Sequence, residues 1–260
     1  MGLLAIQYKT ATEAHILVAA NREERYDRPW LPPSIQSGKP RTLCGLDQPS
    51  SGTWLGVNQH GLLVAALARR KYEPPVEPIS RNVLCRELLR SDSARHALDK
   101  AMEELVTNAY EGVNLILADS ESGWAIHGWD DIDCVELQEG LSIISARDVN
   151  DHTDPRVAMA HRLLTLQTLD SPVKFLAMAS KVFSRSPSPP GRPSMVLRTK
   201  DFGTVSSTLL SLGKKPRDAI FQFAAGPPDK AHYEDFSPFL RDILSRGIRE
   251  AQQAREKSKA

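Results

Sequence analysis

Blocks of strand-like apolar runs alternate along the chain with blocks of helix-like apolar spacing. This order of blocks constrains the fold more than any other feature of the sequence. Short apolar runs with branched side chains, typical of strands, come first, at 3–8, at 15–20 and in a hairpin over 51–68. Apolar residues spaced three and four apart then predict two helices within 80–106. Runs of each type, in place of strict strand–helix alternation, favour packed layers that contain antiparallel sheets.

The second half of the chain repeats this block pattern. We expect strands at 113–119, 123–129, 133–138 and 141–146, then helices at 154–169 and 171–183. Late strands are expected within "SMVLRT", "GTVSSTLLSLG" and "AIFQFAAG". A charged helix and tail begin near Ser237, and "SRSPSPPGRP" at 184–193 predicts a surface loop, because proline disfavours helices and central strands. The pattern predicts a single domain over 1–260.

Composition excludes several classes of protein and partner. With 41% hydrophobic and 25% charged residues the chain is typical of globular proteins, and a net charge of +1 gives no general attraction for nucleic acid or an anionic membrane. No apolar run approaches the ~20 residues of a membrane span. Cys44, Cys85 and Cys134 are widely spaced, and neither they nor the histidines have metal-ligand spacing. We therefore expect no metal site and a reducing, cytoplasmic location.

One stretch carries charge where a buried strand is expected to end. In "LVAANREERYDRPW" the apolar residues 17–20 give way to Asn21 and then to Arg22-Glu23-Glu24-Arg25. Most charge runs are solvated, and this interpretation is retained for Arg25, Asp27 and Arg28. A strand end can also aim a guanidinium rigidly at a carboxylate or phosphate. The residues alone leave both interpretations of Arg22 open.

Five segments occur in a specific order: "LLAIQY", "LVAANREERYDRP", "GTWLGVNQHGLLVAALARR", "EGVNLILAD" and "FGTVSSTLLSLG". In sequence and spacing they resemble the NRDE family, also called the transport and Golgi organisation family, over about residues 3–240. The resemblance implies an N-terminal-nucleophile hydrolase-like fold, which is an α+β, four-layer αββα sandwich of two mainly antiparallel sheets. The hydrophobic periods favour the same layers.

The resemblance also implies a site, which this chain alters. Hydrolases of this fold use an N-terminal cysteine as the nucleophile, whereas Gly2 has no side chain. "Ala68-Arg69" stands where relatives read Thr-Asn, Ala146 replaces an expected asparagine, and Val205 replaces a common arginine. Asn21, Arg22 and Glu23 keep the motif, with one extra methylene at Glu23. The resemblance implies no catalytic residue and these candidate ligand-binding residues: Gly2, Asn21, Arg22, Glu23, Ala68, Arg69 and Ala146.

Two functions compete on these residues. The first is a non-catalytic cleft protein that binds or carries a small amphipathic anionic ligand of the haem or acyl-lipid type, with which the resembled family is linked. Arg22 would anchor the anionic group, Glu23 would orient Arg22, and Arg69 would add a second cation. The small residues at the site would widen the cleft. The alternative is an amidohydrolase, if position 2 is naturally cysteine or another nucleophile substitutes.

Overall fold

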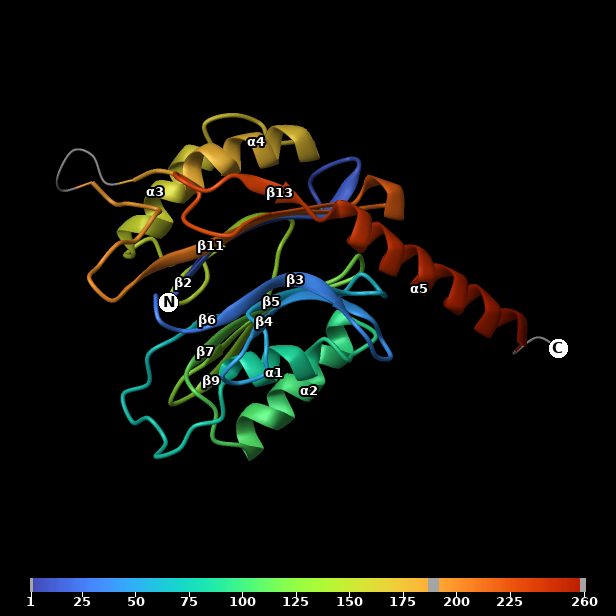
Figure 1. The fold of residues 1–260 in the computed structure, drawn as a ribbon, viewed down its shortest axis with the longest axis horizontal. Coiled ribbons are helices and arrows are strands. Elements are labelled where there is room, and N and C mark those ends of the chain that lie inside the picture. The colour runs from blue at the N-terminus through green and yellow to red at the C-terminus, as the bar shows by residue number, and fades with distance from the viewer. Residues whose placement is uncertain (1, 187–191, 258–260) are drawn as a thin grey trace.

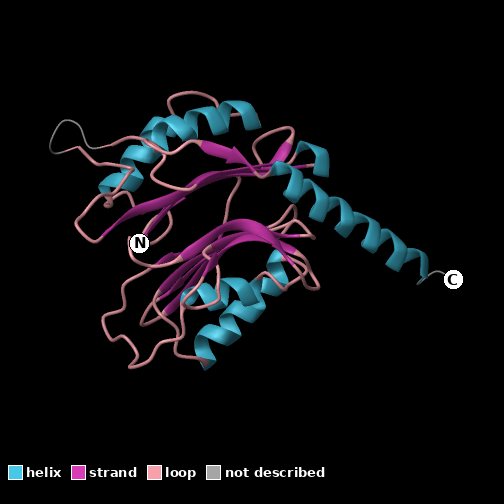
Figure 2. Cartoon of the chain, viewed as in Figure 1, coloured by secondary structure: helices cyan, strands magenta, loops and turns pink. Residues whose placement is uncertain are grey.

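The computed structural model describes residues 2–186 and 192–257. Two sheets lie face to face, with α3 and α4 on the outer face of one and α1 and α2 on the outer face of the other (Figures 1 and 2). Every strand pairing among the described residues is antiparallel. The α+β sandwich of two antiparallel sheets predicted from the sequence is confirmed.

Across the described residues, six strands form the first sheet and seven form the second. The first sheet has the order β10-β1-β2-β11-β12-β13, with bounds Gly140–Ile144, Gly2–Tyr8, Ala14–Arg25, Phe202–Gly213, Ile220–Ala224 and Tyr233–Asp235. The second is a meander from β3 to β9, with bounds Trp30–Gln36, Thr42–Asp47, Leu55–Asn58, Leu63–Ala68, Val113–Ala118, Gly123–Gly128 and Ile132–Glu136. The predicted hairpin within 51–68 is β5–β6.

The helices follow the predicted blocks. Their bounds are α1 Arg81–Leu88, α2 Ala94–Thr107, α3 Pro155–Leu164, α4 Pro172–Phe183 and α5 Ser237–Lys257, and a 3-10 turn lies at Pro216–Asp218. The helix expected at 154–169 ends at Leu164, and residues 165–169 form a loop. Helix α5 starts at the far end of the first sheet and projects beyond the sandwich (Figure 1).

Strand β1 lies inside the first sheet, between β10 and β2, and Gly2 is its first residue. Alternate side chains serve two cores. Leu4 and Ile6 pack between the two sheets, whereas Leu3 and Ala5 pack against α3 and α4. Burial on both faces explains why residues 3–8 are almost entirely apolar.

The structure corrects two details of the sequence interpretation and leaves a third untested. Strand β2 does not end at Asn21 but continues to Arg25, because β11 pairs with it as far as Phe202. "SMVLRT" forms no strand, although Met195 and Val196 are fully buried, and only an isolated bridge joins Arg198 to Gly203. Of the surface loop expected at 184–193, residues 187–191 lie outside the described residues.

Candidate functional site

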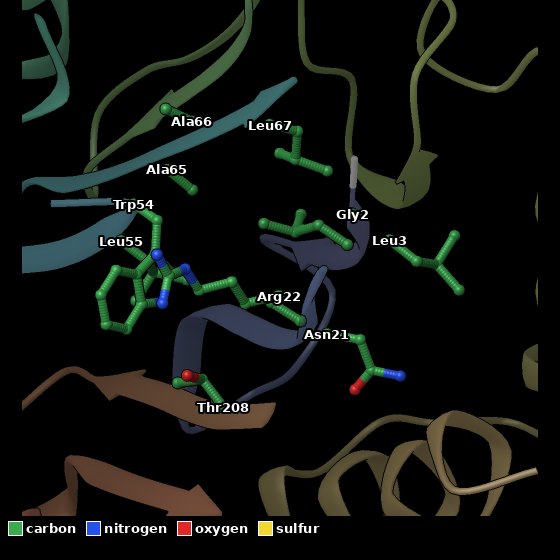
Figure 3. Close-up of a pocket in the computed structure, with 12 residues that line it drawn as sticks. Gly2, Leu3, Asn21, Arg22, Trp54, Leu55, Ala65, Ala66, Leu67 and Thr208 are labelled. Atoms are coloured by element: carbon green, nitrogen blue, oxygen red, sulfur yellow. The ribbon is translucent and has the colours of Figure 1, made fainter. Parts of the chain in front are cut away.

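A small cavity of about 40 Å³ lies between the two sheets, beside Gly2 (Figure 3). The first sheet contributes Gly2, Arg22 and Thr208 to its wall, and the second contributes Leu67. Trp54, which precedes β5, also lines it. The cavity therefore sits where the first residue of the first strand faces the opposite sheet.

Strand pairing brings these residues together. Gly2 and Ser206 both pair directly with Arg22, on the two sides of β2, and Thr208 pairs with Ala20. Paired residues of neighbouring strands project from the same face of a sheet. The side chains of Arg22 and Thr208 therefore enter the space between the sheets on the same side as the missing side chain of Gly2.

Arg22 crosses this space and is held by the second sheet. Its guanidinium carbon lies 4.0 Å from the ring centroid of Trp54, and Nη2 lies 3.2 Å from Oδ1 of Asp47. The side chain is buried, and burial lowers the pKa of Arg22 to about 10, so it remains a cation at neutral pH. Nη1 is buried and has no hydrogen-bond partner among the described residues. One donor of this cation is left unused beside the cavity.

Asp47, at the end of β4, is the central acid of this cluster. It is fully buried and accepts two hydrogen bonds from Arg28, at 2.6 and 2.8 Å, besides those from Arg22 and Ser50. Burial alone would raise the pKa of Asp47, but hydrogen bonds from Arg28, Ser50 and Asn82 outweigh it and lower the pKa to about 2. The sequence gives no sign of this role, since an acid after an apolar run also suits a surface turn. Arg28 is thus a partner of the site, contrary to its interpretation as a solvated charge.

Glu23 and Asn21 face the other side of the first sheet. The carboxylate of Glu23 is fully buried and pairs with Arg156 of α3. The side-chain amide of Asn21 donates to the backbone oxygens of Phe183, at 3.0 Å, and Met195, at 2.9 Å, and it points away from Arg22 (Figure 3). The expectation that Glu23 lines the cleft and orients Arg22 is therefore wrong, because alternation along β2 places the two side chains on opposite faces.

Ala68, Arg69 and Ala146 lie outside the lining of this cavity. Arg69 follows β6, forms an ion pair of 2.7 Å with Asp148, and lies 5.1 Å from the ring centroid of Trp129. Its charge is already balanced, so the structure does not present it as a second cation of the cavity. Ala68 ends β6 and Ala146 comes two residues after β10, so neither alanine adds to the volume beside Gly2.

A buried histidine fixes the loop that follows β10. Asn114 donates to the backbone oxygens of Ser145 and Arg147, so its side-chain oxygen is the acceptor of the 2.9 Å contact with Nδ1 of His127. Nε2 of His127 accepts from the backbone N–H of Val149 at 3.3 Å. The ring is thus neutral with its proton on Nδ1, and burial lowers its pKa. Both ring nitrogens are engaged, so His127 has no lone pair free for a haem iron.

Two further properties bear on the class of site. Among the described residues, no three His, Cys, Asp or Glu side chains gather as metal ligands do. Within the same residues, none of the helices combines the length and the apolar character needed to cross a membrane.

The two facing sheets, with the first strand starting at the cavity between them, define an N-terminal-nucleophile hydrolase-like fold. The N-acylethanolamine-hydrolyzing acid amidase ortholog of Caenorhabditis elegans is similar, with a TM-score of 0.52 and 14% identity over 80% of this chain and 92% of that one. Penicillin V acylase from Agrobacterium tumefaciens has a TM-score of 0.53 and 12% identity, over 90% of this chain and 86% of that one. Such low identities show the shared fold alone.

The chain belongs to the Transport and Golgi organisation 2 family, whose model matches residues 1–221. This match confirms the resemblance inferred from the sequence motifs. No curated protein matches the chain by sequence.

Proposed function

We propose that this protein is a non-catalytic cleft protein that binds or carries a small amphipathic ligand through an anionic group held by Arg22. One observation carries the proposal: Nη1 of the buried Arg22 has no hydrogen-bond partner among the described residues, and Arg22 lines the cavity. An unsatisfied buried donor costs about 1–3 kcal/mol, and more when it is charged. An anionic oxygen in the cavity would recover that cost.

The surroundings of Arg22 favour an anion in two ways. Burial lowers the pKa of Arg22, which means that its neighbours do not fully compensate the cost of removing the cation from water. The Trp54 ring lies against the guanidinium and fixes its orientation, so little freedom is lost when a ligand binds. A carboxylate or phosphate oxygen fits both features.

The size of the cavity limits which part of the ligand enters it. Its volume of about 40 Å³ is room for about three water molecules, which matches a carboxylate and not a porphyrin ring or an acyl chain. The apolar body of the ligand would then lie outside the cavity. A haem propionate or a phosphate oxygen of an acyl-CoA satisfies this condition.

The absence of a nucleophile at position 2 supports a binding role. Gly2 has no reactive side chain, and Thr208 is the hydroxyl residue that lines the cavity. The described residues that line the cavity include no histidine, aspartate or glutamate, so none of these side chains lies in the lining to activate Thr208 as a base. The alternative, an amidohydrolase, is favoured by the names of the two similar structures, an amidase and an acylase.

The binding role can be tested by titrating haem and palmitoyl-CoA into the wild type and Arg22→Ala. Loss of a charge-assisted contact of about 1.5–3 kcal/mol should weaken binding roughly tenfold or more. Arg25→Ala is a matched control, because Arg25 lies three residues along the same strand and pairs with Asp27 on the surface. Circular dichroism shows whether each variant is folded. Equal affinity of folded wild type and Arg22→Ala, or no binding of either ligand to the wild type, would overturn the proposal.

The alternative is tested by turnover of an N-acylethanolamine and of penicillin V by the wild type. We expect none above background. Turnover that disappears in Arg22→Ala and in Thr208→Ala would instead establish an amidohydrolase that uses this cavity with a different nucleophile.

A further inference from the structure

We propose a second binding site, for a short aliphatic carboxylate, at the opposite end of the sandwich from Gly2. A groove of about 240 Å³ lies there between the turn of the β5–β6 hairpin, the ends of β2 and β11, and helix α5. Figure 1 shows α5 at the end of the molecule that is far from the N-terminus. This site does not depend on the function proposed for the cavity beside Gly2.

The groove and the first cavity are separate sites on the same strands. His15, at the start of β2, lines the groove, whereas Arg22, further along β2, lines the cavity. Seven residues of an extended strand span about 23 Å. A short ligand in the groove therefore cannot reach Arg22.

Aliphatic side chains form part of the wall of the groove. Ile16 and Leu212 are buried and form its floor, and Leu244 and Ile248 of α5 form one side. Ile248 is 46% exposed, so a hydrophobic ligand lying against it would remove apolar surface from water. Helix α5 begins after residue 221, where the family match ends, so this wall is built by a segment outside the matched region.

Among the described residues, the rim of the groove carries one cation, Lys214. His15, His60 and Lys214 line it, and no acidic residue does. The structure gives their side chains no hydrogen bond or ion pair within the described residues, so Lys214 has its charge available for a ligand. This charge complementarity identifies the occupant as an anion with an apolar chain.

Another groove on the surface has a similar volume but a different lining. The groove beside Lys39 has a similar volume of about 260 Å³ and is also lined by Arg86 and Arg90. Arg86 donates to the backbone oxygen of Ser51, and Arg90 pairs with Glu87 at 3.0 Å. Its arginines are therefore already used by the protein, and the described residues of its lining include no exposed large aliphatic side chain such as Ile248.

Size and shape restrict the ligand further. A volume of about 240 Å³ is below the ~300–1,000 Å³ of sites for drug-sized molecules, so the chain of the ligand must be short. In the arrangement we infer, the carboxylate meets Lys214 and the aliphatic chain lies on Leu244 and Ile248. A medium-chain fatty acid has both parts.

Isothermal titration calorimetry with octanoate tests this site. Octanoate should bind the wild type saturably at concentrations up to about 10 mM. Lys214→Gln should weaken binding about two- to fivefold, as expected for one exposed charge contact. Ile248→Ser should weaken it about fivefold through lost apolar contact. Both residues are exposed, so neither substitution should unfold the protein.

Two controls make the result decisive. Octanol has the same chain without the charge and should bind more weakly than octanoate. Arg25→Ala should leave octanoate affinity unchanged, since Arg25 pairs with Asp27 on the surface and lines neither the groove nor the cavity. The site is refuted if octanoate does not bind the wild type saturably, or if Lys214→Gln and Ile248→Ser bind it like the wild type.

Discussion

Arg22 and Glu23 are neighbours in the sequence, yet their side chains belong to different layers of the molecule. Arg22 points between the sheets to Asp47 and Trp54, and Glu23 points to Arg156 under the helices. Each charge is buried with a partner from a distant segment, as buried charges require. The alternation of side chains along β2, and not an interaction between the two residues, sets the direction of each side chain.

This arrangement predicts the outcome of double-mutant cycles. Glu23→Gln and Arg156→Gln should couple by about 1–3 kcal/mol in the free energy of unfolding, because the two side chains are in contact. The cycle of Glu23→Gln with Arg22→Gln should give a clearly smaller coupling. Urea unfolding of the single and double variants measures both energies. A larger coupling of Glu23 with Arg22 than with Arg156 would show that the two charges share one side of the sheet.

Asp47 should be the most sensitive acid of the site. Asp47→Asn leaves the buried Arg22 and its neighbour Arg28 with one carboxylate fewer, and breaking such a buried pair costs about 3–5 kcal/mol. Asp27→Asn serves as the control, since Asp27 pairs with Arg25 in the solvent and should change the unfolding free energy far less. Equal effects of the two substitutions would contradict the central place of Asp47.

The pH dependence of stability follows from the same residue. The pKa of Asp47 is about 2 in the folded protein, below its ordinary value of 3.8, so the unfolded state takes up the proton first as pH falls. The stability that Asp47 contributes is fully present above about pH 4 and is lost as pH falls through about 2. Asp47→Asn should flatten this part of the curve of unfolding free energy against pH. An unchanged acid limb in the variant would assign the pH dependence to other carboxylates.

At the scale of elements, buried strands were predictable and polar or proline-containing strands were not. The apolar runs at 3–8 and 113–119 correctly predicted β1 and β7. Both runs are apolar because both faces of each strand are buried. Strand β3, "WLPPSIQ", holds two prolines and is accommodated only because it is an edge strand with an irregular register between Leu31 and Ser34. From the sequence, the charged half of β2 was interpreted as the end of a strand. It continues as a strand because it pairs with β11, which lies far away in the sequence.

Helix α5 provides a prediction in which packing opposes helix propensity. An added Cβ at Gly247 would lie 2.0 Å from the backbone oxygen of Gln59, in the turn that lines the groove beside Lys214. Gly247→Ala should therefore destabilise the protein by about 1–3 kcal/mol through overpacking, although alanine is favoured over glycine in a helix by about 1 kcal/mol. Thermal or urea unfolding measures the change.

The exposed position Gln252 of the same helix supplies the control for this prediction. Gln252→Ala meets no backbone and should leave the unfolding free energy nearly unchanged. If Gly247→Ala stabilises the protein instead, α5 is not packed closely on the β5–β6 turn.

For the whole molecule, the sequence predicted the layers well and the site only in part. The order of hydrophobic periods indicated the sandwich, and the motifs placed Gly2 and Arg22 together, as the pairing of β1 with β2 does. Asp47 and Trp54 complete the surroundings of Arg22 from the second sheet. Contacts between sheets depend on tertiary packing, which local periodicity does not encode, so Asp47 and the pairing of Glu23 with Arg156 could not be predicted.

In the binding role proposed for this protein, the unused donor of Arg22 holds an anionic ligand group beside Gly2. The most direct test of this claim is the 1H–15N NMR spectrum of the arginine side chains during a titration with palmitoyl-CoA, with Arg22 assigned through Arg22→Lys. We predict that the Arg22 guanidinium signals shift saturably and exchange more slowly with water, while those of Arg25 stay in place. Unchanged Arg22 signals at saturating ligand would contradict the claim.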